Sequence, residues 1–201
     1  MMEWTAFEDQ ARAEGYTCIC GIDEAGRGPL AGPVYAAAVV LRPGQVIEGV
    51  NDSKKLSEKK REALFDTICS QCAAYGIGSA TEKEIDEINI LNATYLAMQR
   101  AVAALPVQPD CALVDGNRAP DLPLEVRTII KGDAQSASIA AASILAKVNR
   151  DRYMLQMAEK YPQYAFEKHK GYGTKLHYER LEQYGISPIH RLSFLKKWMN
   201  R

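Results

Sequence analysis

The feature that most constrains the fold is a pair of apolar segments joined by a connection rich in glycine and proline. Residues 16–23 (YTCICGID) and 34–41 (VYAAAVVL) each have the length and apolar content of a buried strand. Glycines and prolines at 28–33 interrupt regular structure between them. The two segments therefore predict neighbouring antiparallel strands.

The next part of the chain alternates between helix and strand patterns. Ser57 is an expected N-cap for a helix over 58–74, and Thr81 with Glu84 forms a capping-box pattern before a helix over 82–105. Short apolar runs bounded by turn residues predict three further strands, at 74–81, 111–115 and 124–130.

The C-terminal part is predicted to be helical. A helix rich in small residues, which can lie close to a sheet, is expected over 134–157, and amphipathic helices over 174–185 and 191–199. The order of elements predicts an α/β fold, with a mixed five-stranded sheet flanked by helices and a helical C-terminal extension. We expect residues 1–201 to form a single domain, in which about 160–201 are a helical C-terminal subdomain.

Charge is unevenly distributed along the chain, although the formal net charge is zero. Residues 147–201 contain 12 Lys or Arg and 5 Asp or Glu, and the remainder is acidic. This pattern suits a polyanionic ligand together with a metal site, although a solvated helical face can produce it too. No uncharged apolar run reaches 18 residues and the acidic N-terminus lacks a signal-peptide core, so we expect a cytoplasmic protein without a membrane-spanning helix.

The five cysteines allow two interpretations. Cys18 and Cys20 fall in an expected strand and Cys69 and Cys72 in an expected helix, so together they could supply four zinc ligands. The alternative, small buried hydrophobic side chains in a reducing compartment, is favoured because the C-x-C spacing suits a strand better than a zinc knuckle.

Four carboxylates stand close to the ends of expected strands. Asp23 and Glu24 end the first strand, Asp115 ends the strand at 111–115, and Asp133 opens the long helix. If these strands are neighbours, about 4.8 Å apart, the side chains can converge. Clustered carboxylates need a cation, and oxygen ligands favour Mg²⁺ or Mn²⁺. Two such ions about 3.5–4 Å apart would suit phosphodiester hydrolysis.

Each carboxylate also has a structural explanation. Asp115 precedes a glycine, as turn residues do, and Asp133 precedes a helix, as N-caps do. Asp23 and Glu24 are adjacent, and successive strand residues point to opposite faces of a sheet. Both can reach one metal site only if the strand bends or ends there, which Gly26 would permit.

The sequence Gly26-Arg27-Gly28 follows the carboxylate pair. Its glycines let a ligand approach main-chain N–H groups, which suit phosphate or hydroxyl oxygens, and Arg27 adds a charge for phosphate. The spacing is neither that of a P-loop nor that of a dinucleotide fingerprint. A plain tight turn is the other interpretation.

Polar residues elsewhere are candidates for phosphate contacts, although a solvated surface explains them equally well. They are Ser53, Lys54, Lys55, Lys147 and Lys170. The three histidines lie in the basic segment, and we expect phosphate contact or capping of them rather than general-base catalysis. These are His169, His177 and His190.

Seven ordered blocks of sequence carry a resemblance to a known family. They are GIDEAGRGPLAGPV, NDSKKLSEKKR, IDEINILNAT, LVDGN, KGDAQSASIAAASILAKVNRD, HKGYGT and HRLSF. In this order they resemble type 2 ribonuclease H, the bacterial ribonuclease HII, over roughly residues 16–195.

The resemblance implies a ribonuclease H-like fold and an endonuclease that hydrolyses the RNA strand of RNA–DNA hybrids. It also implies cutting on the 5′ side of ribonucleotides embedded in duplex DNA, which leaves 3′-hydroxyl and 5′-phosphate ends. The implied roles are removal of ribonucleotides and of RNA primers from DNA.

The family's site residues can be carried over to matching positions. The metal-binding, catalytic carboxylates would be Asp23, Glu24, Asp115 and Asp133, holding Mg²⁺ or Mn²⁺. The backbone of Gly26, Arg27 and Gly28 would sense the 2′-hydroxyl, and Tyr172 would stack on the sugar beside the scissile bond.

The departures from the family pattern are small. Ala134 stands where serine is more usual and Asn149 where threonine is common, so only fine substrate contacts are affected. The C-terminus shows no evident clamp-binding peptide, and we expect a monomer. The rival functions are another nuclease or strand-transferase on the same fold, such as a resolvase, and a non-catalytic hybrid-binding protein.

Overall fold

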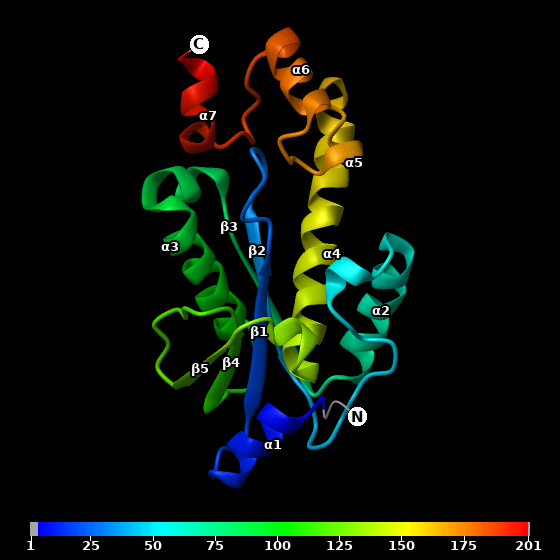
Figure 1. Ribbon diagram of the computed structural model, residues 1–201, viewed down its shortest axis with the longest axis vertical. Coiled ribbons are helices and arrows are strands. Elements are labelled where there is room, and N and C mark those ends of the chain that lie inside the picture. The colour runs from blue at the N-terminus through cyan, green and yellow to red at the C-terminus, as the bar shows by residue number, and fades with distance from the viewer. Residues whose placement is uncertain (1–3, 201) are drawn as a thin grey trace.

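The computed structural model describes residues 4–200, in which a five-stranded sheet has helices on both faces (Figure 1). The strand order is β3-β2-β1-β4-β5, with β1 antiparallel to β2, β2 antiparallel to β3, and β4 and β5 running parallel to β1. The bounds are β1 Ile19–Ala25, β2 Val34–Val40, β3 Ala74–Ala80, β4 Cys111–Asp115 and β5 Glu125–Ile129. The predicted mixed five-stranded sheet and its antiparallel first pair are confirmed.

Seven α-helices are described in residues 4–200. They are α1 Ala6–Ala13, α2 Glu58–Gln71, α3 Glu82–Ala103, α4 Ala137–Lys160, α5 Phe166–His169, α6 Lys175–Tyr184 and α7 Leu192–Met199. In Figure 1, α3 lies on one side of the long strands and α4 with α2 on the other. The predicted N-cap at Ser57 and the capping box of Thr81 and Glu84 are both present.

Small residues allow the two long helices to lie close to the sheet. A Cβ atom added to Gly21 of β1 would overlap the backbone of α4 at Ser138 and Ile139. A Cβ atom added to Gly78 of β3 would likewise overlap the backbone of α3 at Ala97. Helix α4, which was expected to pack closely because of its small residues, does so. The close approach also requires a glycine on the strand, because a Cβ atom there would overlap the helix.

The C-terminal helical part is joined to the β1–β2 connection by backbone hydrogen bonds. The amide of Leu30 donates to the carbonyl of Gly171 (2.8 Å), and that of Gly32 donates to Ile189 (2.9 Å). The amide of Arg191 donates back to Leu30 (2.8 Å). The connection therefore runs between two C-terminal segments, as an added strand would.

Several element boundaries differ from the predicted ones. Strand β1 begins at Ile19 and continues to Ala25, so Asp23 and Glu24 lie within the strand rather than at its end. Helix α4 starts at Ala137 with Ser136 as its N-cap, so Asp133 does not open it. Asp133 lies instead in a short 3₁₀ turn over Gly132–Ala134 that follows a left-handed Lys131.

Other differences have local causes. Helix α2 ends at Gln71 because the chain turns extended at Cys72 to enter β3. Helix α3 ends at Ala103, two residues early, and is kinked at Asn89, whose φ of 65° is left-handed. Its side chain accepts from the amides of Leu91 and Asn92, so it caps the second half of the helix. The four-residue α5 was not predicted, because one turn leaves no periodicity.

Helix α1 was also missed by the sequence analysis, and it fixes the start of α4. The Glu8 side chain is buried, and its Oε1 accepts from Ser138 N (3.0 Å), Ser138 Oγ (2.6 Å) and Ser136 Oγ (2.7 Å). A carboxylate at a helix N-terminus also complements the helix dipole. Glu8 therefore holds the segment that follows Asp133.

The cysteines pack in the core. Cys20 lies in the cluster on the α3 face of the sheet, with Cys18 packed against it, whereas Cys72 and Cys69 belong to the cluster on the α4 face. Among the described residues, the two pairs are thus on opposite faces, and the zinc interpretation is wrong for them. No helix in residues 4–200 is both long and apolar enough to cross a bilayer.

We predict that Glu8→Ala lowers the free energy of unfolding by about 2–4 kcal/mol, because three hydrogen bonds to a charged group are lost and buried hydroxyls lose their acceptor. Urea denaturation of the metal-free protein measures this. The matched control is Asp9→Ala on the same helix, whose exposed carboxylate pairs with Arg12 and should change stability by less than about 0.5 kcal/mol. Equal effects of the two substitutions would contradict the role given to Glu8.

Candidate active site

Three neighbouring segments bring the four candidate carboxylates together. Ile22 of β1 pairs with Val114 of β4, which sets Asp23 and Asp115 at the same level of adjacent strands. The amide of Gly132, next to Asp133, donates to Asp115 Oδ1 (2.6 Å) and ties the 3₁₀ turn to the end of β4. The sheet order that places β1 beside β4 and β4 beside β5 is thus what gathers these side chains.

The carboxylates repel one another in a buried setting. Burial, with the charges of Glu24 and Asp115, raises the pKa of Asp23 well above its ordinary value. Burial also raises the pKa of Glu24, with Arg27 acting in the opposite sense and Asp115 in the same one. Burial and Asp115 raise the pKa of Asp133. Such a set is unfavourable without a compensating cation.

Nearby cations compensate this charge only in part. Arg27 Nη1 lies 3.4 Å from Glu24 Oε1, and Lys54 Nζ lies 3.8 Å from Asp133 Oδ2. Both basic side chains are largely exposed, so each pair is screened by solvent. Asp52, which sequence reasoning missed, adds negative charge to Asp133.

Two hollows flank the carboxylates. One, of about 220 Å³, is lined by Asp23, Glu24, the Gly26–Gly28 turn and Tyr172, with Ser53, Lys54, Ser143 and Lys147. The other, of about 320 Å³, lies toward α3 and is lined by Glu24, Arg27 and Asp115, with Thr94, Tyr95 and Arg118 among others. Asp23 lines only the first, whereas Glu24 lines both, which is consistent with the alternation of side chains along β1.

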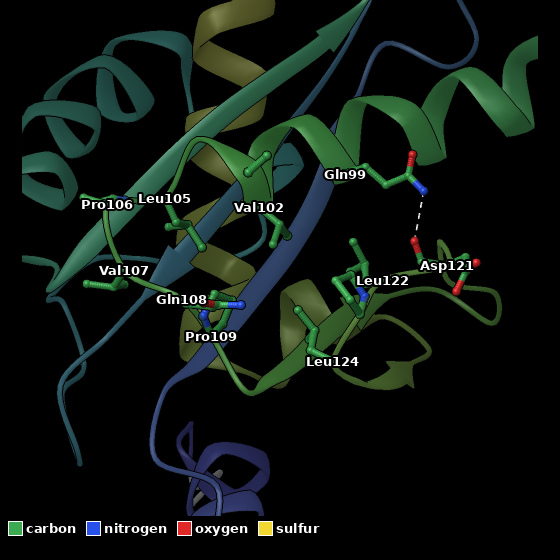
Figure 2. Close-up of a pocket in the computed structure, with 12 residues that line it drawn as sticks. Gln99, Val102, Leu105, Pro106, Val107, Gln108, Pro109, Asp121, Leu122 and Leu124 are labelled. Atoms are coloured by element: carbon green, nitrogen blue, oxygen red, sulfur yellow. Dashed lines mark hydrogen bonds between the residues drawn. The ribbon is translucent and has the colours of Figure 1, made fainter.

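A larger hollow lies elsewhere and holds none of these residues. It has a volume of about 580 Å³ and lies at the C-terminal end of α3, where Figure 2 shows Val102, Leu105, Leu122 and Leu124 around it. Its one labelled interaction is between Gln99 and the carbonyl of Asp121. Its lining is mostly apolar and includes none of the four candidate carboxylates.

The Gly26–Gly28 turn and Tyr172 meet across the first hollow. Gly26 has a φ of 98°, which favours glycine, and a Cβ atom there would overlap the Arg150 side chain. A Cβ atom on Gly28 would lie 3.7 Å from the ring of Tyr172, so the turn and the ring are close neighbours. The Tyr172 side chain is exposed and free to contact a ligand.

The basic candidates differ in how available they are. Lys54 is 82% exposed, and Lys55 is also exposed. Lys147 donates to Asp151 (2.7 Å) and lines the first hollow, whereas Lys170 donates to the carbonyl of Glu167 (2.8 Å). Of the two serines here, the buried Ser53 accepts from Ser143 Oγ (2.7 Å), and the pair lines the same hollow.

The expected phosphate contacts of the histidines are wrong. His169, His177 and His190 are all buried and pack against one another, with His177 Nε2 2.9 Å from His190 Nε2. Burial lowers the pKa of both His177 and His190 to about 4, so they are neutral at pH 7. They lie beneath the Tyr172 loop, where His177 Nδ1 meets the Tyr172 carbonyl (2.9 Å).

An all-oxygen set of buried, mutually repelling carboxylates fits a hard divalent cation. In residues 4–200, no three His, Cys, Asp or Glu side chains already form a closed set of ligands. A bound ion would therefore have to draw these side chains toward itself. Burial, together with the charge of Asp115, raises the pKa of Asp23, Glu24 and Asp133, and a bound cation would favour their ionised forms.

Comparison with known proteins identifies the family of the chain. The family model of ribonuclease HII matches residues 20–197. The chain belongs to the ribonuclease HII family. It is therefore a ribonuclease H, a phosphodiester hydrolase, which decides against a non-catalytic binding protein and against another nuclease or strand-transferase on the same fold.

Individual relatives cover nearly all of this ribonuclease HII chain. A ribonuclease HII of Caldicellulosiruptor bescii is 59% identical over 189 residues, covering 94% of this chain and 92% of the relative. The crystal structure of ribonuclease H2 from Pyrococcus horikoshii superposes with a TM-score of 0.73 at 30% identity, covering 88% of this chain and 93% of that one. The fold is thus the predicted ribonuclease H-like fold.

A more distant solved structure shares the fold. It is Bst-RNase HIII in complex with Mn²⁺, with a TM-score of 0.63 at 18% identity, covering 93% of this chain and 73% of that one.

We predict that Asp23→Asn raises the melting temperature of the metal-free protein at pH 8 by about 2–8 °C, the shift that about 1–2 kcal/mol gives in a domain of this size. The amide keeps the acceptor that bonds the Glu24 amide and removes the repelled charge. Calorimetry in chelator measures it.

The matched control is Asp151→Asn, a buried carboxylate paired with Lys147 and Arg61, which should lower the melting temperature. A pKa raised by folding means that wild-type stability is lost as pH rises through it. The Asp23→Asn advantage should therefore shrink as the pH falls toward about 3.9, the value of an unfolded aspartate. An advantage independent of pH would contradict this account.

Proposed function

We propose that this ribonuclease HII cuts duplex DNA on the 5′ side of an embedded ribonucleotide, in addition to hydrolysing the RNA strand of RNA–DNA hybrids. The observation that carries the proposal is that one hollow is lined by two carboxylates, the Gly26–Gly28 backbone and the Tyr172 ring. A single ribose beside the scissile phosphate would meet all three.

We propose Asp23, Glu24, Asp115 and Asp133 as the residues that hold a divalent cation, Mg²⁺ or Mn²⁺. When bound, two such ions would supply activation of water and stabilisation of the leaving oxygen of a phosphodiester. The oxygen-only donor set supports this assignment, as does the Mn²⁺ bound by the related ribonuclease HIII. The negative carboxylates would repel the phosphate, so it would approach on the side where Arg27 and Lys54 lie.

The turn would read the ribose through its main chain. The amides of Arg27 and Gly28 have no acceptor in the part of the chain that the structure describes. A 2′-hydroxyl could accept from one of them, and a deoxyribose would leave it unpaired, which can produce strong discrimination. Because water is the nucleophile, the hydroxyl is recognised but not consumed, and the products would carry 3′-hydroxyl and 5′-phosphate ends.

The remaining contacts would be with phosphates. Lys54 is exposed at the rim of the hollow, and Lys147 and Ser53 line it. Lys170 lies on the segment that carries Tyr172 and would approach the same strand. A helical C-terminal part that is basic suits a duplex laid across it. The proposed roles are removal of ribonucleotides and RNA primers from DNA, in the cytoplasm of a bacterial cell.

The first prediction tests the metal ligands. Asp115→Asn should lower cleavage in Mg²⁺ by about 10²–10³-fold, the loss typical when one group that supports transition-state charge is removed. Its Oδ1 acceptor for Gly132 N remains, so the fold should be kept. The control is Asp121→Asn at the larger hollow, which should cleave normally. Near-normal activity of Asp115→Asn would refute its assignment.

The second prediction concerns the cut itself. A duplex with one ribonucleotide should be cut once, on its 5′ side, without a 2′,3′-cyclic phosphate. A 2′-O-methyl group at that ribose should block cleavage, because the added methyl group crowds the glycine turn and keeps the 2′-oxygen away from the amides. Sequencing gels of end-labelled strands decide this. Cyclic-phosphate ends, or equal cutting of an all-DNA duplex, would overturn the proposed function.

The third prediction concerns Tyr172. If its ring stacks on the sugar, Tyr172→Ala should reduce cleavage roughly 5- to 150-fold, since stacking on a nucleotide contributes about 1–3 kcal/mol. Tyr172→Phe should retain most activity, because the ring is kept. Measured kcat/KM values for the two variants that fall equally would show that the hydroxyl, and not the ring, carries the role.

A further inference from the structure

Two fully buried arginines lie behind the Gly26–Gly28 turn. Arg150 from α4 and Arg191 from the start of α7 both have 0% exposure. In residues 4–200, neither guanidinium forms a salt bridge with a carboxylate. Burial and the neighbouring Arg150 lower the pKa of Arg191 to about 9, which still leaves it charged at pH 7. Buried cations without a salt-bridge partner are costly, so their placement calls for an explanation.

The Arg191 side chain donates hydrogen bonds to the backbone of the turn. Its Nη2 donates to the carbonyl of Gly26 (2.6 Å), its Nη1 to that of Arg27 (3.0 Å), and its Nε to that of Gly32 (2.8 Å). One planar guanidinium therefore holds both peptide groups of the turn and the far end of the same connection.

Because the peptide bond is planar, the hydrogen bonds to these carbonyls also set the direction of the amides in the same peptide groups. In a trans peptide the C=O of one residue and the N–H of the next point in opposite directions. No cis peptide occurs in the described chain. With the Gly26 and Arg27 carbonyls turned inward to Arg191, the amides of Arg27 and Gly28 must point outward. Both of these residues are exposed and line the hollow with Asp23 and Glu24.

Arg150 joins the same turn to the tyrosine loop. Its Nη2 donates to the carbonyls of Ala31 (3.2 Å) and Lys170 (2.9 Å), and its guanidinium carbon lies 5.7 Å from the centre of the Tyr172 ring. A Cβ atom on Gly26 would overlap it. The two arginines thus fix the backbone that faces the ribose relative to the ring that faces the sugar.

We infer that Arg191 is a positioning residue for ribonucleotide recognition: it holds the 26–27 and 27–28 peptide groups with their N–H groups facing the ribose. This rests on the proposed function of the turn. Arg191 is buried and touches no substrate, so it acts only through the backbone. Its contribution is to selectivity for ribose, beyond any contribution to the stability of the C-terminal helices.

The test compares two affinities of each variant, for a duplex with one ribonucleotide and for the same duplex in DNA alone. They are measured by fluorescence anisotropy in chelator, with intact duplex verified on a gel. Arg191→Met, which keeps length but removes the donors, should reduce the ratio of the two affinities roughly tenfold, as expected for loss of about one hydrogen bond. Arg191→Lys, which can reach one carbonyl at most, should reduce it less.

The matched control is Tyr164→Phe in the same helical part. The Tyr164 hydroxyl donates to the carbonyls of Gly185 (3.0 Å) and Tyr184 (3.3 Å), both of which lie outside the turn. Its loss should lower the melting temperature without changing the affinity ratio. This separates loss of orientation from loss of stability, and Arg191→Lys provides the comparison if Arg191→Met does not fold.

An unchanged ratio in a folded Arg191 variant, including equal losses for both duplexes, would overturn the inference and leave the proposed function standing. A wild-type protein that binds both duplexes equally would overturn the proposed function, and the inference with it. A reduced ratio in the Arg191 variants, with the Tyr164→Phe ratio unchanged, would support both.

Discussion

The interaction on which the site depends is the repulsion among carboxylates held in a largely buried place. Adjacent strands carry Asp23 and Asp115 at one level, and a 3₁₀ turn adds Asp133. Burial raises the pKa of Asp23 because its ionised form loses solvation and meets like charges. Hydrogen bonds around the carboxylates keep them in this arrangement. Gly132 N donates to Asp115, and Glu8 accepts from the start of α4, just beyond Asp133. The site is thus held in an unfavourable state that a divalent cation would relieve.

A second constraint is buried positive charge behind the Gly26–Gly28 turn. Behind Gly26–Gly28, two buried guanidiniums bond to carbonyl oxygens rather than to carboxylates. The inward carbonyls satisfy Arg191, and the outward amides remain for a ligand. The C-terminal part, basic in sequence, thus also contributes a buried arginine, Arg191, that is hydrogen-bonded to the main chain beside the carboxylates.

Much of this could be predicted from the sequence, and the reasons for the failures are physical. The apolar runs 34–41 and 111–115 gave strands nearly at their bounds, since both lie in the core and their turns are marked by Gly, Pro or Asp. The end of β1 was misplaced because pairing with β2 continues through charged Glu24, which no hydrophobic pattern can signal. Helix α1 was missed because its role is one buried carboxylate bonded to residues 128–130 positions away in the sequence. The histidines were assigned to phosphate contact or capping, and the phosphate contacts were wrong because local charge says nothing about burial.

The arginines show where sequence reasoning ends. Arg150 and Arg191 were counted among the basic residues that suggested a nucleic-acid surface, yet both are fully buried. Without the fold, an arginine in a helical pattern is expected to be exposed. The carbonyls that Arg191 binds belong to Gly26 and Arg27, which lie 165 and 164 residues away in the sequence. If carboxylates from the sheet supply the chemistry and Arg191 sets the backbone that faces the ribose, as we propose, separate parts of the chain would determine rate and selectivity. Substitutions behind the turn should therefore alter which sugar is accepted while leaving the carboxylates in place.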